Sequence, residues 1–281
     1  MKYIKYHALG NDYIVINPEN IKKEINQDMI RLICHRNYGV GSDGILLGPC
    51  NSQSCDFGLK IFNPDGSEAE KSGNGLRIFA RSLLDNSFTD KSIFTVETLG
   101  GAVSCEVSSN RRIVKVEMGA VSFDSTIIPV TGSPREVLNE TIKIDGHNLK
   151  FCAATVGNPH CIILYDDLSP ETTRRYGPKI ETNSLFPNRT NVQFMQMIDR
   201  SNIQIEIWER GAGYTLASGS SSTAAAAVAF KLGLCDANIT VHMPGGKIEI
   251  TLDNDFFARM TGSVTKVCEG KIANEMLEKI F

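Results

Sequence analysis

Two Gly-Asn pairs in this chain are each followed, at almost the same distance, by a serine that opens a helix-like run. Ser72 lies 61 positions after the Asn of Gly10-Asn11, and Ser218 lies 60 positions after the Asn of Gly157-Asn158. Directly after each pair the chain continues as an apolar, strand-like segment. Repetition at this spacing constrains the fold strongly, because it indicates one structural unit that occurs twice.

A third landmark supports the duplication. Asn63 lies 9 positions before Ser72, and Glu209 lies 9 positions before Ser218. Chance can produce one such match, but three in the same order predict two similar halves related by a pseudo-twofold axis.

Short β-rich runs separated by Gly, Asn, Asp and Pro recur along the chain at hairpin spacing, which predicts a sheet-dominated fold. The two helices expected from Ser72 to about Leu84 and from Ser218 to about Leu232 are nearly apolar all round, which is typical of buried central helices. We therefore predict an α+β fold of two pseudo-symmetric halves, each a curved, mostly antiparallel β-sheet or barrel wrapped around a central buried α-helix. Further helices are expected at Gln27–Cys34, Ser169–Tyr176 and Glu269–Lys279.

The domain boundary is expected near Gly119, with the end of the chain returning to the first half. The predicted first half comprises residues 1–118 and 263–281, and the second comprises residues 119–262. An active site is expected in the cleft between them, because each half offers one equivalent helix start.

Charge and cysteine usage exclude several classes of partner. The net charge is −3, so neither nucleic acid nor an anionic membrane surface is an expected partner. The apolar run from Ala224 to Phe230 is too short to span a bilayer, and the N-terminus has no apolar core of signal-peptide length. Eight cysteines without a C-x-x-C pair favour reduced thiols in a cytoplasmic protein and give no support for a metal site.

The two helix starts are candidate anion-binding sites. Ser72-Gly73-Asn74-Gly75 and Ser218-Gly219-Ser220 place small residues where the free N–H groups of a first helical turn point outward. Small side chains allow a carboxylate or phosphate to approach the backbone. Simple N-capping by serine explains either site alone, whereas two equivalent sites favour one shared anion.

Common cofactor motifs are missing from the sequence. It has no G-x-x-x-x-G-K-[ST] pattern for nucleotide phosphates. Gly73-Asn-Gly75 is too short for a dinucleotide fingerprint, and no lysine stands in a context that singles it out for pyridoxal phosphate. We therefore expect no cofactor.

The remaining candidate residues are polar and mostly neutral. Asparagine in loops usually serves turns, but Asn11 and Asn158 recur through the duplication. Arg210 beside Glu209 can clamp a carboxylate, or form a surface ion pair. The full candidate set is Asn11, Asn63, Asn74, Asn158 and Asn191 with His160, Glu209 and Arg210.

Over essentially its full length the chain resembles the diaminopimelate epimerase family, cofactor-independent enzymes that invert an amino-acid α-carbon. The resemblance implies two pseudo-symmetric halves of sheet around a helix, in agreement with the duplication. The motifs that carry it are His7-Ala-Leu-Gly-Asn-Asp, Asn63-Pro-Asp-Gly-Ser-Glu-Ala-Glu with Gly73-Asn-Gly, Gly157-Asn-Pro-His160, Arg189-Thr-Asn191-Val, and Trp208-Glu-Arg-Gly with the helix start at Gly219.

The resemblance also implies roles for individual residues. His160 and Glu209 would tune the two acid/base groups. The substrate's reacting α-carboxylate would lie on the N–H groups of Gly73, Asn74, Gly219 and Ser220. The distal amino-acid end would be held by Asn11, Asn63, Asn158, Asn191 and Arg210.

The chain departs from the resemblance at the chemistry. The family uses one cysteine on each face of the α-carbon, and the resemblance places these at Ser72 and Ser218. A thiol has a pKa of about 8.5, which falls further at a helix N-terminus, whereas a serine hydroxyl is far more basic. A serine pair is thus a poor α-proton shuttle unless His160 or Glu209 acts as the base.

Three interpretations follow for the serine pair. The chain is a variant disabled to trap a substrate, a natural branch with different proton chemistry, or a binding protein that kept the pocket. The predicted function is cofactor-free interconversion of LL- and meso-diaminopimelate in lysine and cell-wall precursor synthesis, with this amino acid as the small-molecule partner. The alternatives are a racemase or proton-shifting isomerase for another amino acid with His or Glu as the base, and a non-catalytic amino-acid-binding homologue. Membership of the family also implies a homodimer.

Overall fold

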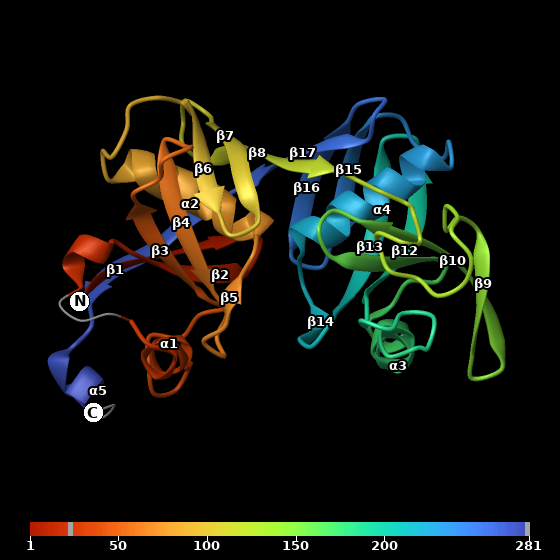
Figure 1. Cartoon of the computed structure of the whole chain (residues 1–281), viewed down its shortest axis with the longest axis horizontal. Helices are drawn as coiled ribbons and strands as arrows, with labels where there is room; N and C mark the ends of the chain where they lie inside the picture. The colour runs from red at the N-terminus through yellow and green to blue at the C-terminus, as the bar shows by residue number, and fades with distance from the viewer. Residues whose placement is uncertain (22–24, 279–281) are drawn as a thin grey trace. The chain divides into compact units, whose positions relative to one another are not determined.

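A computed structural model describes residues 1–21 and 25–278 (Figure 1). The chain folds as two compact units, Met1–Glu117 together with the chain from Gly262, and Met118–Thr261. The boundary falls inside two strands, Ile113–Ala120 and Phe257–Ser263. The expected domain assignment of 22–24 and 279–281 lies outside the described residues.

The first unit combines elements from the N-terminal part of the chain with the last strand and the last helix of the described residues. Its elements are β1 (Lys2–Ala8), β2 (Asn11–Ile16), the short 3-10 turn η1 (Pro18–Asn20), α1 (Gln27–Cys34), β3 (Ile45–Cys50), β4 (Phe57–Phe62), β5 (Glu68–Ala69), α2 (Gly73–Asp85), β6 (Ile93–Thr98), β7 (Gly101–Val107), β8 (Ile113–Ala120), β18 (Thr265–Lys271) and α5 (Asn274–Glu278).

From β10 to β17 the second unit repeats the order of strands and α-helices that the first unit has from β1 to β8, and β9 corresponds to β18. Its elements are β9 (Glu140–Ile144), β10 (His147–Thr155), β11 (Pro159–Leu164), α3 (Pro170–Glu181), β12 (Asn191–Asp199), β13 (Asn202–Glu209), β14 (Gly213–Thr215), α4 (Gly219–Lys231), β15 (Asn238–Met243), β16 (Gly246–Leu252) and β17 (Phe257–Ser263).

Strand pairing confirms the duplication within the described residues. In the first unit the succession is β18-β1-β2-β3-β4-β6-β7-β8, with β5 as a short neighbour of β4. The second unit gives β9-β10-β11-β12-β13-β15-β16-β17, with β14 beside β13. In both successions only the third and fifth pairs are parallel, so each sheet is mostly antiparallel as predicted.

The central helices are buried as their sequences predict. Almost every side chain of α2 from Gly73 to Leu84 is buried, and so is α4 from Gly219 to Ala229 apart from Ser220. In α4 the hydroxyls of Ser222 and Thr223 donate to the carbonyls of Ser218 (2.8 Å) and Gly219 (2.9 Å), which satisfies them inside the core. Each unit therefore wraps its strands around one buried helix (Figure 1).

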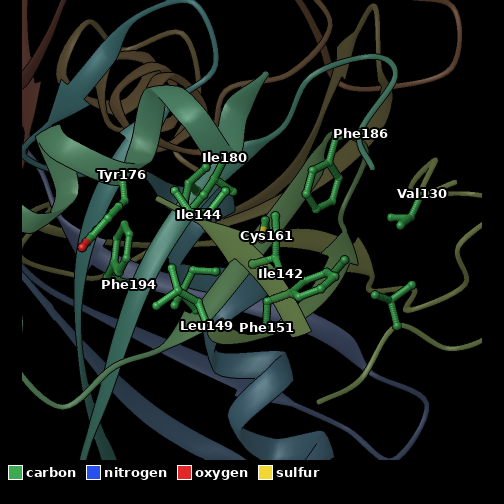
Figure 2. Close-up of a cluster of buried hydrophobic side chains, with 14 of the residues drawn as sticks. Val130, Ile142, Ile144, Leu149, Phe151, Cys161, Tyr176, Ile180, Phe186 and Phe194 are labelled. Carbon is green, nitrogen blue, oxygen red and sulfur yellow. The ribbon is translucent and has the colours of Figure 1, made fainter. Parts of the chain in front are cut away.

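A second apolar layer lies between each sheet and its outer helix. In the second unit Tyr176 and Ile180 of α3 pack with Phe194 of β12 and Phe151 of β10 (Figure 2). The rings of Phe151 and Phe186 meet edge to face, with centroids 6.1 Å apart. In the first unit α1 packs on Ile14, Ile16 and Ile45 in the same way. These layers fix the strands whose ends carry the candidate residues.

The expected helix Glu269–Lys279 is wrong in its first part. Residues up to Lys271 belong to β18, which pairs antiparallel with β1, and only Asn274–Glu278 is helical. The helical pattern of this charged segment was overridden by strand pairing, since β1 offers an edge that β18 completes. Lys279 lies outside the described residues.

Candidate functional site

Ser72 caps the N-terminus of α2. Its backbone is extended and its Oγ accepts the N–H of Gly75 at 3.0 Å, the arrangement of an N-cap. The same Oγ lies 3.1 Å from the hydroxyl of Tyr13, which is 7% exposed. Gly73 and Asn74 form the first turn of this helix, and their expected contact with an anion stays a prediction.

Asn11 contacts this helix start directly. It opens β2 after Gly10, whose φ of +86° suits glycine at the tight β1–β2 turn. The side-chain amide of Asn74 donates to Oδ1 of Asn11 at 3.0 Å, and Asn11 donates to Asp43 at 3.0 Å. Asn11 and Asn74 thus form one hydrogen-bonded chain at the start of α2.

A buried guanidinium supports Asn74. Arg77 has no exposed surface, donates to Oδ1 of Asn74 and donates to the carbonyl of Ser263 at 3.2 Å. Its Nε has no hydrogen-bond partner among the described residues. Burial lowers the pKa of Arg77 to about 10, so it keeps its charge at neutral pH. A positive charge one turn into α2 adds to the attraction of the helix start for an anion.

Asn63 and Glu209 occupy the same position in two corresponding turns. Asn63 follows β4, and its carbonyl accepts the N–H of Gly66 at 3.0 Å. Glu209 ends β13, and its carbonyl accepts the N–H of Ala212 at 3.1 Å. The side chain of Asn63 donates to Ser67 at 2.9 Å within its own turn. Their expected contacts with a ligand stay a prediction.

Ser218 caps α4 as Ser72 caps α2. Its Oγ accepts the N–H of Ser221 at 3.4 Å. Asn158 follows Gly157, whose φ is +113°, and its amide donates to Oγ of Ser220 at 3.5 Å. This contact reproduces the Asn11–Asn74 contact of the first unit, so each serine-capped helix start has one asparagine from a preceding hairpin beside it.

His160 is a buried neutral base. Its Nε2 lies 3.0 Å from Oδ1 of Asn158, and the ring has no exposed surface. Burial, reinforced by the nearby charge of Arg210, lowers the pKa of His160 to about 3 despite an opposing contact with Gln193. A ring with so low a pKa is a weak proton acceptor at neutral pH. It is better suited to orienting Asn158 than to removing an α-proton.

Asn191 and Arg210 are joined through the backbone. Asn191 is buried, donates to the carbonyl of Pro159 at 2.9 Å and accepts the N–H of Arg210 at 3.0 Å. The guanidinium of Arg210 donates to the carbonyl of Asn188 at 3.0 Å, and the residue is exposed. The structure brings these two predicted residues together, while the clamp of Arg210 on a carboxylate stays a prediction.

The residue that holds the Trp208-Glu-Arg-Gly segment is not apparent from the sequence. The carboxylate of Glu181, at the end of α3, accepts the indole N–H of Trp208 at 2.7 Å and the N–H of Gly211 at 2.8 Å. It also pairs with Arg189. Glu181 is 3% exposed, so this buried carboxylate fixes the turn that carries Glu209 and Arg210.

Tyr13 and Arg77 were also missed. Tyr13 stands two positions after Asn11, as His160 stands two after Asn158, and this offset in the duplication is a signal that could have found it. Arg77 follows the first turn of α2, and nothing in its local sequence distinguishes it from a surface arginine.

None of the described helices is long and apolar enough to cross a bilayer. No group of three His, Cys, Asp or Glu side chains in this part of the chain is arranged to hold a metal ion. All eight cysteines are free thiols, and five of them are buried.

Comparison with known sequences identifies the family. The sequence profile of diaminopimelate epimerase matches residues 3–123 and 152–267. The chain is 60% identical to diaminopimelate epimerase 2 of Nostoc sp. (strain PCC 7120) over 276 residues, 98% of this chain and 97% of the relative. The chain belongs to the diaminopimelate epimerase family. The resemblance inferred from the motifs is thereby confirmed. The diaminopimelate epimerase of Alkaliphilus metalliredigens is 36% identical, with 99% of both chains covered.

Solved structures share the fold of this diaminopimelate epimerase family member at low sequence identity. A hydroxyproline epimerase from Agrobacterium vitis matches with a TM-score of 0.71 and 14% identity, covering 97% of this chain and 90% of that one. A phenazine biosynthesis protein of the PhzF family from Bacillus anthracis matches with a TM-score of 0.68 and 16% identity, covering 97% and 99%. Both confirm the predicted fold class.

Proposed function

We propose that the chain interconverts LL- and meso-diaminopimelate without a cofactor, by proton transfer at the α-carbon. The observation that carries this function is the full-length match to diaminopimelate epimerases, at 60% identity for the Nostoc relative. The duplicated helix starts add physical support, because a reaction that exchanges protons on two faces of one carbon needs two equivalent groups.

The proposed ligand contacts follow from the two helix starts. The α-carboxylate lies on the N–H groups of Gly73, Asn74, Gly219 and Ser220. The buried charge of Arg77 strengthens the α2 site for this anion. The distal end of the substrate is held by Asn11, Asn63, Asn158, Asn191 and Arg210, whose amides and guanidinium suit an ammonium-carboxylate group.

In the proposed reaction Ser72 and Ser218 are the groups that face the α-carbon. Both cap a helix and each accepts a backbone N–H through Oγ. His160 and Glu209 act on these groups indirectly, and the low pKa of His160 argues against its serving as the base itself. Because a hydroxyl is a much weaker acid than a thiol, we expect slow turnover.

We further propose that the protein is cytoplasmic and forms a homodimer. Eight free thiols support a reducing compartment. The homodimer is supported by β18, which in the described part of the chain is bonded to β1 alone and exposes Val267 at 52%. An exposed edge strand is a ready pairing surface for a second copy.

The function is tested by α-hydrogen exchange. The chain is incubated with LL- or meso-diaminopimelate in deuterated water, and proton NMR follows the loss of the α-hydrogen signal. We expect exchange with both isomers and none with proline, glutamate or lysine. Exchange with another amino acid but not with diaminopimelate would replace the substrate and favour a racemase. Binding of diaminopimelate by calorimetry without any exchange would instead indicate a binding protein.

A further inference from the structure

The contact between Tyr13 and Ser72 joins two hydroxyl groups at the start of α2. Their oxygens are 3.1 Å apart, although the residues are 59 positions apart in sequence. Tyr13 is buried, and a Cβ added to Gly44 would lie 2.7 Å from Cε1 of its ring. The ring therefore packs closely on bare backbone, which holds its hydroxyl in a fixed direction.

The hydrogen-bonding capacity of Ser72 leaves room for one more proton. A serine oxygen has one O–H and two acceptor positions. The N–H of Gly75 uses one acceptor position at 3.0 Å. If the O–H donates to Tyr13, the second acceptor position stays available to a proton that arrives from a bound ligand.

The second unit lacks this pair of hydroxyls. Tyr13 and His160 occupy corresponding strand positions, because Tyr13 lies opposite Tyr6 in the β1–β2 hairpin and His160 lies opposite Ala154 in the β10–β11 hairpin. The His160 ring bonds Asn158 through Nε2. Each unit thus has a side chain able to carry a proton at this strand position, Tyr13 in the first and His160 in the second. Among the described contacts, only the capping serine of the first unit, Ser72, has a phenol as its partner.

We propose that Tyr13 and Ser72 form a proton-relay pair on the α2 side of the substrate. The proposal rests on the proposed function. The bond between the substrate's α-carbon and its hydrogen breaks, and the proton goes to Oγ of Ser72 while the electron pair stays on the α-carbon, delocalised into the carboxylate. At the same time the O–H proton of Ser72 passes to the phenolate oxygen of Tyr13. The phenolate forms beforehand by loss of a proton to water.

The relay relieves the main weakness of serine in this reaction. The proton finally resides on a phenol, whose ordinary pKa of about 10 is well below that of an alcohol. Ser72 therefore never has to exist as a free alkoxide. Tyr13 acts through Ser72 and is in this sense a positioning residue, whereas Ser72 touches the substrate.

Tyr13→Phe tests the relay, since it removes one oxygen atom and keeps the packing on Gly44. We expect it to lower the rate of α-hydrogen exchange about a hundredfold, the usual scale of acid–base assistance, with the Kd for diaminopimelate changed less than twofold. The rate of the parent chain should rise with pH as the phenolate fraction grows, and this rise should vanish in Tyr13→Phe. The matched control is Tyr6→Phe, because Tyr6 lies directly across the hairpin and bonds Asp85 instead of Ser72.

A measurement without substrate separates the relay from the proposed function. In protein labelled with carbon-13 at the tyrosine Cζ, the Tyr13 signal is assigned by its loss in Tyr13→Phe. Its titration should shift in Ser72→Ala and stay unchanged in Ser218→Ala. An unaffected Tyr13 signal in Ser72→Ala refutes the relay whatever the substrate. Exchange in the parent chain that Tyr13→Phe leaves unchanged refutes the relay alone, and silence of the parent chain refutes both the relay and the function.

Discussion

Tyr13 and His160 show how single residues differentiate two halves that share one topology. Each lies two positions after a Gly-Asn pair and near a serine-capped helix start. The sequence was sufficient to find His160, because it belongs to a family motif. Two other features could not be predicted from local sequence. The contact of Tyr13 with Ser72 joins residues far apart in the chain, and the buried environment that lowers the pKa of His160 arises only from packing.

The pKa of His160 predicts a pH-dependent stability. Because the folded value of about 3 lies below the ordinary value of 6.5, the unfolded chain binds more protons between these limits. The contribution is complete above pH 6.5 and is lost as the pH falls towards 3. Between pH 7 and pH 5 this single group lowers the free energy of unfolding by about 2 kcal/mol.

Urea titrations of the parent chain and His160→Gln at both pH values measure this effect. The parent should lose about 2 kcal/mol more than the variant between them. His147→Gln, at an exposed position, serves as the control and should follow the parent. Equal losses in the parent and His160→Gln would show that the ring is solvated or charged in the folded chain.

At the scale of elements, local sequence determined some segments and packing determined others. The helix Gln27–Cys34 has the predicted bounds, because Asn26 caps it through the N–H of Met29. The helix expected to end at Tyr176 continues to Glu181 through Pro178, since Ile180 and Glu181 are buried inside the second unit, to which this helix belongs. The end of β18, Glu269–Lys271, was expected to be helical, because the pairing of this strand with β1 joins opposite ends of the sequence. Contacts of this kind cannot be predicted from periodicity.

Glu181 should be the most sensitive charged residue of the second unit. In Glu181→Gln one carboxylate oxygen becomes an NH2 group, which cannot accept a hydrogen bond. This NH2 group then faces other donors, either the Trp208 indole N–H or the Gly211 N–H with Arg189. Leaving buried donors unsatisfied costs about 1–3 kcal/mol. We expect Glu181→Gln to lower the free energy of unfolding by about 2 kcal/mol and to weaken diaminopimelate binding through the Glu209–Arg210 turn.

Chemical denaturation and calorimetry check both effects. Glu140→Gln is the control, because Glu140 pairs with Arg135 where both side chains are about 30% exposed. Such partly exposed pairs contribute about 0–1 kcal/mol. If Glu181→Gln behaves like Glu140→Gln, Glu181 does not hold the turn in solution.

At the scale of the whole molecule, duplication explains why so much of the architecture was predictable. Landmarks spaced 61 and 60 positions apart imply equal amounts of structure between them, and the strand pairings of the two units match accordingly. How the candidate residues of the two halves contact a ligand stays a prediction. The sequence landmarks repeat within each half, and they therefore describe the structure of one half at a time. Assembly of two chains is a separate property, for which β18 is the proposed surface.

Val267→Lys tests the proposed homodimer. A charge placed in the middle of an exposed edge strand opposes pairing with a second copy. We expect the parent chain to have the mass of a dimer by light scattering and the variant to have that of a monomer, with unchanged circular dichroism. The control is Ile127→Lys in the second unit, where Ile127 is 62% exposed. A monomeric parent chain would contradict the proposal outright.

The central claim is that the two capping serines occupy the acid/base positions of an epimerase. The most direct test compares α-hydrogen exchange of meso-diaminopimelate in deuterated water between the parent chain and Ser72→Cys/Ser218→Cys. A thiol pKa lies several units below that of a hydroxyl, so we predict that the double variant exchanges faster by about a thousandfold or more. Equal rates in the two proteins, or no exchange in either, would show that Ser72 and Ser218 do not face the reacting carbon.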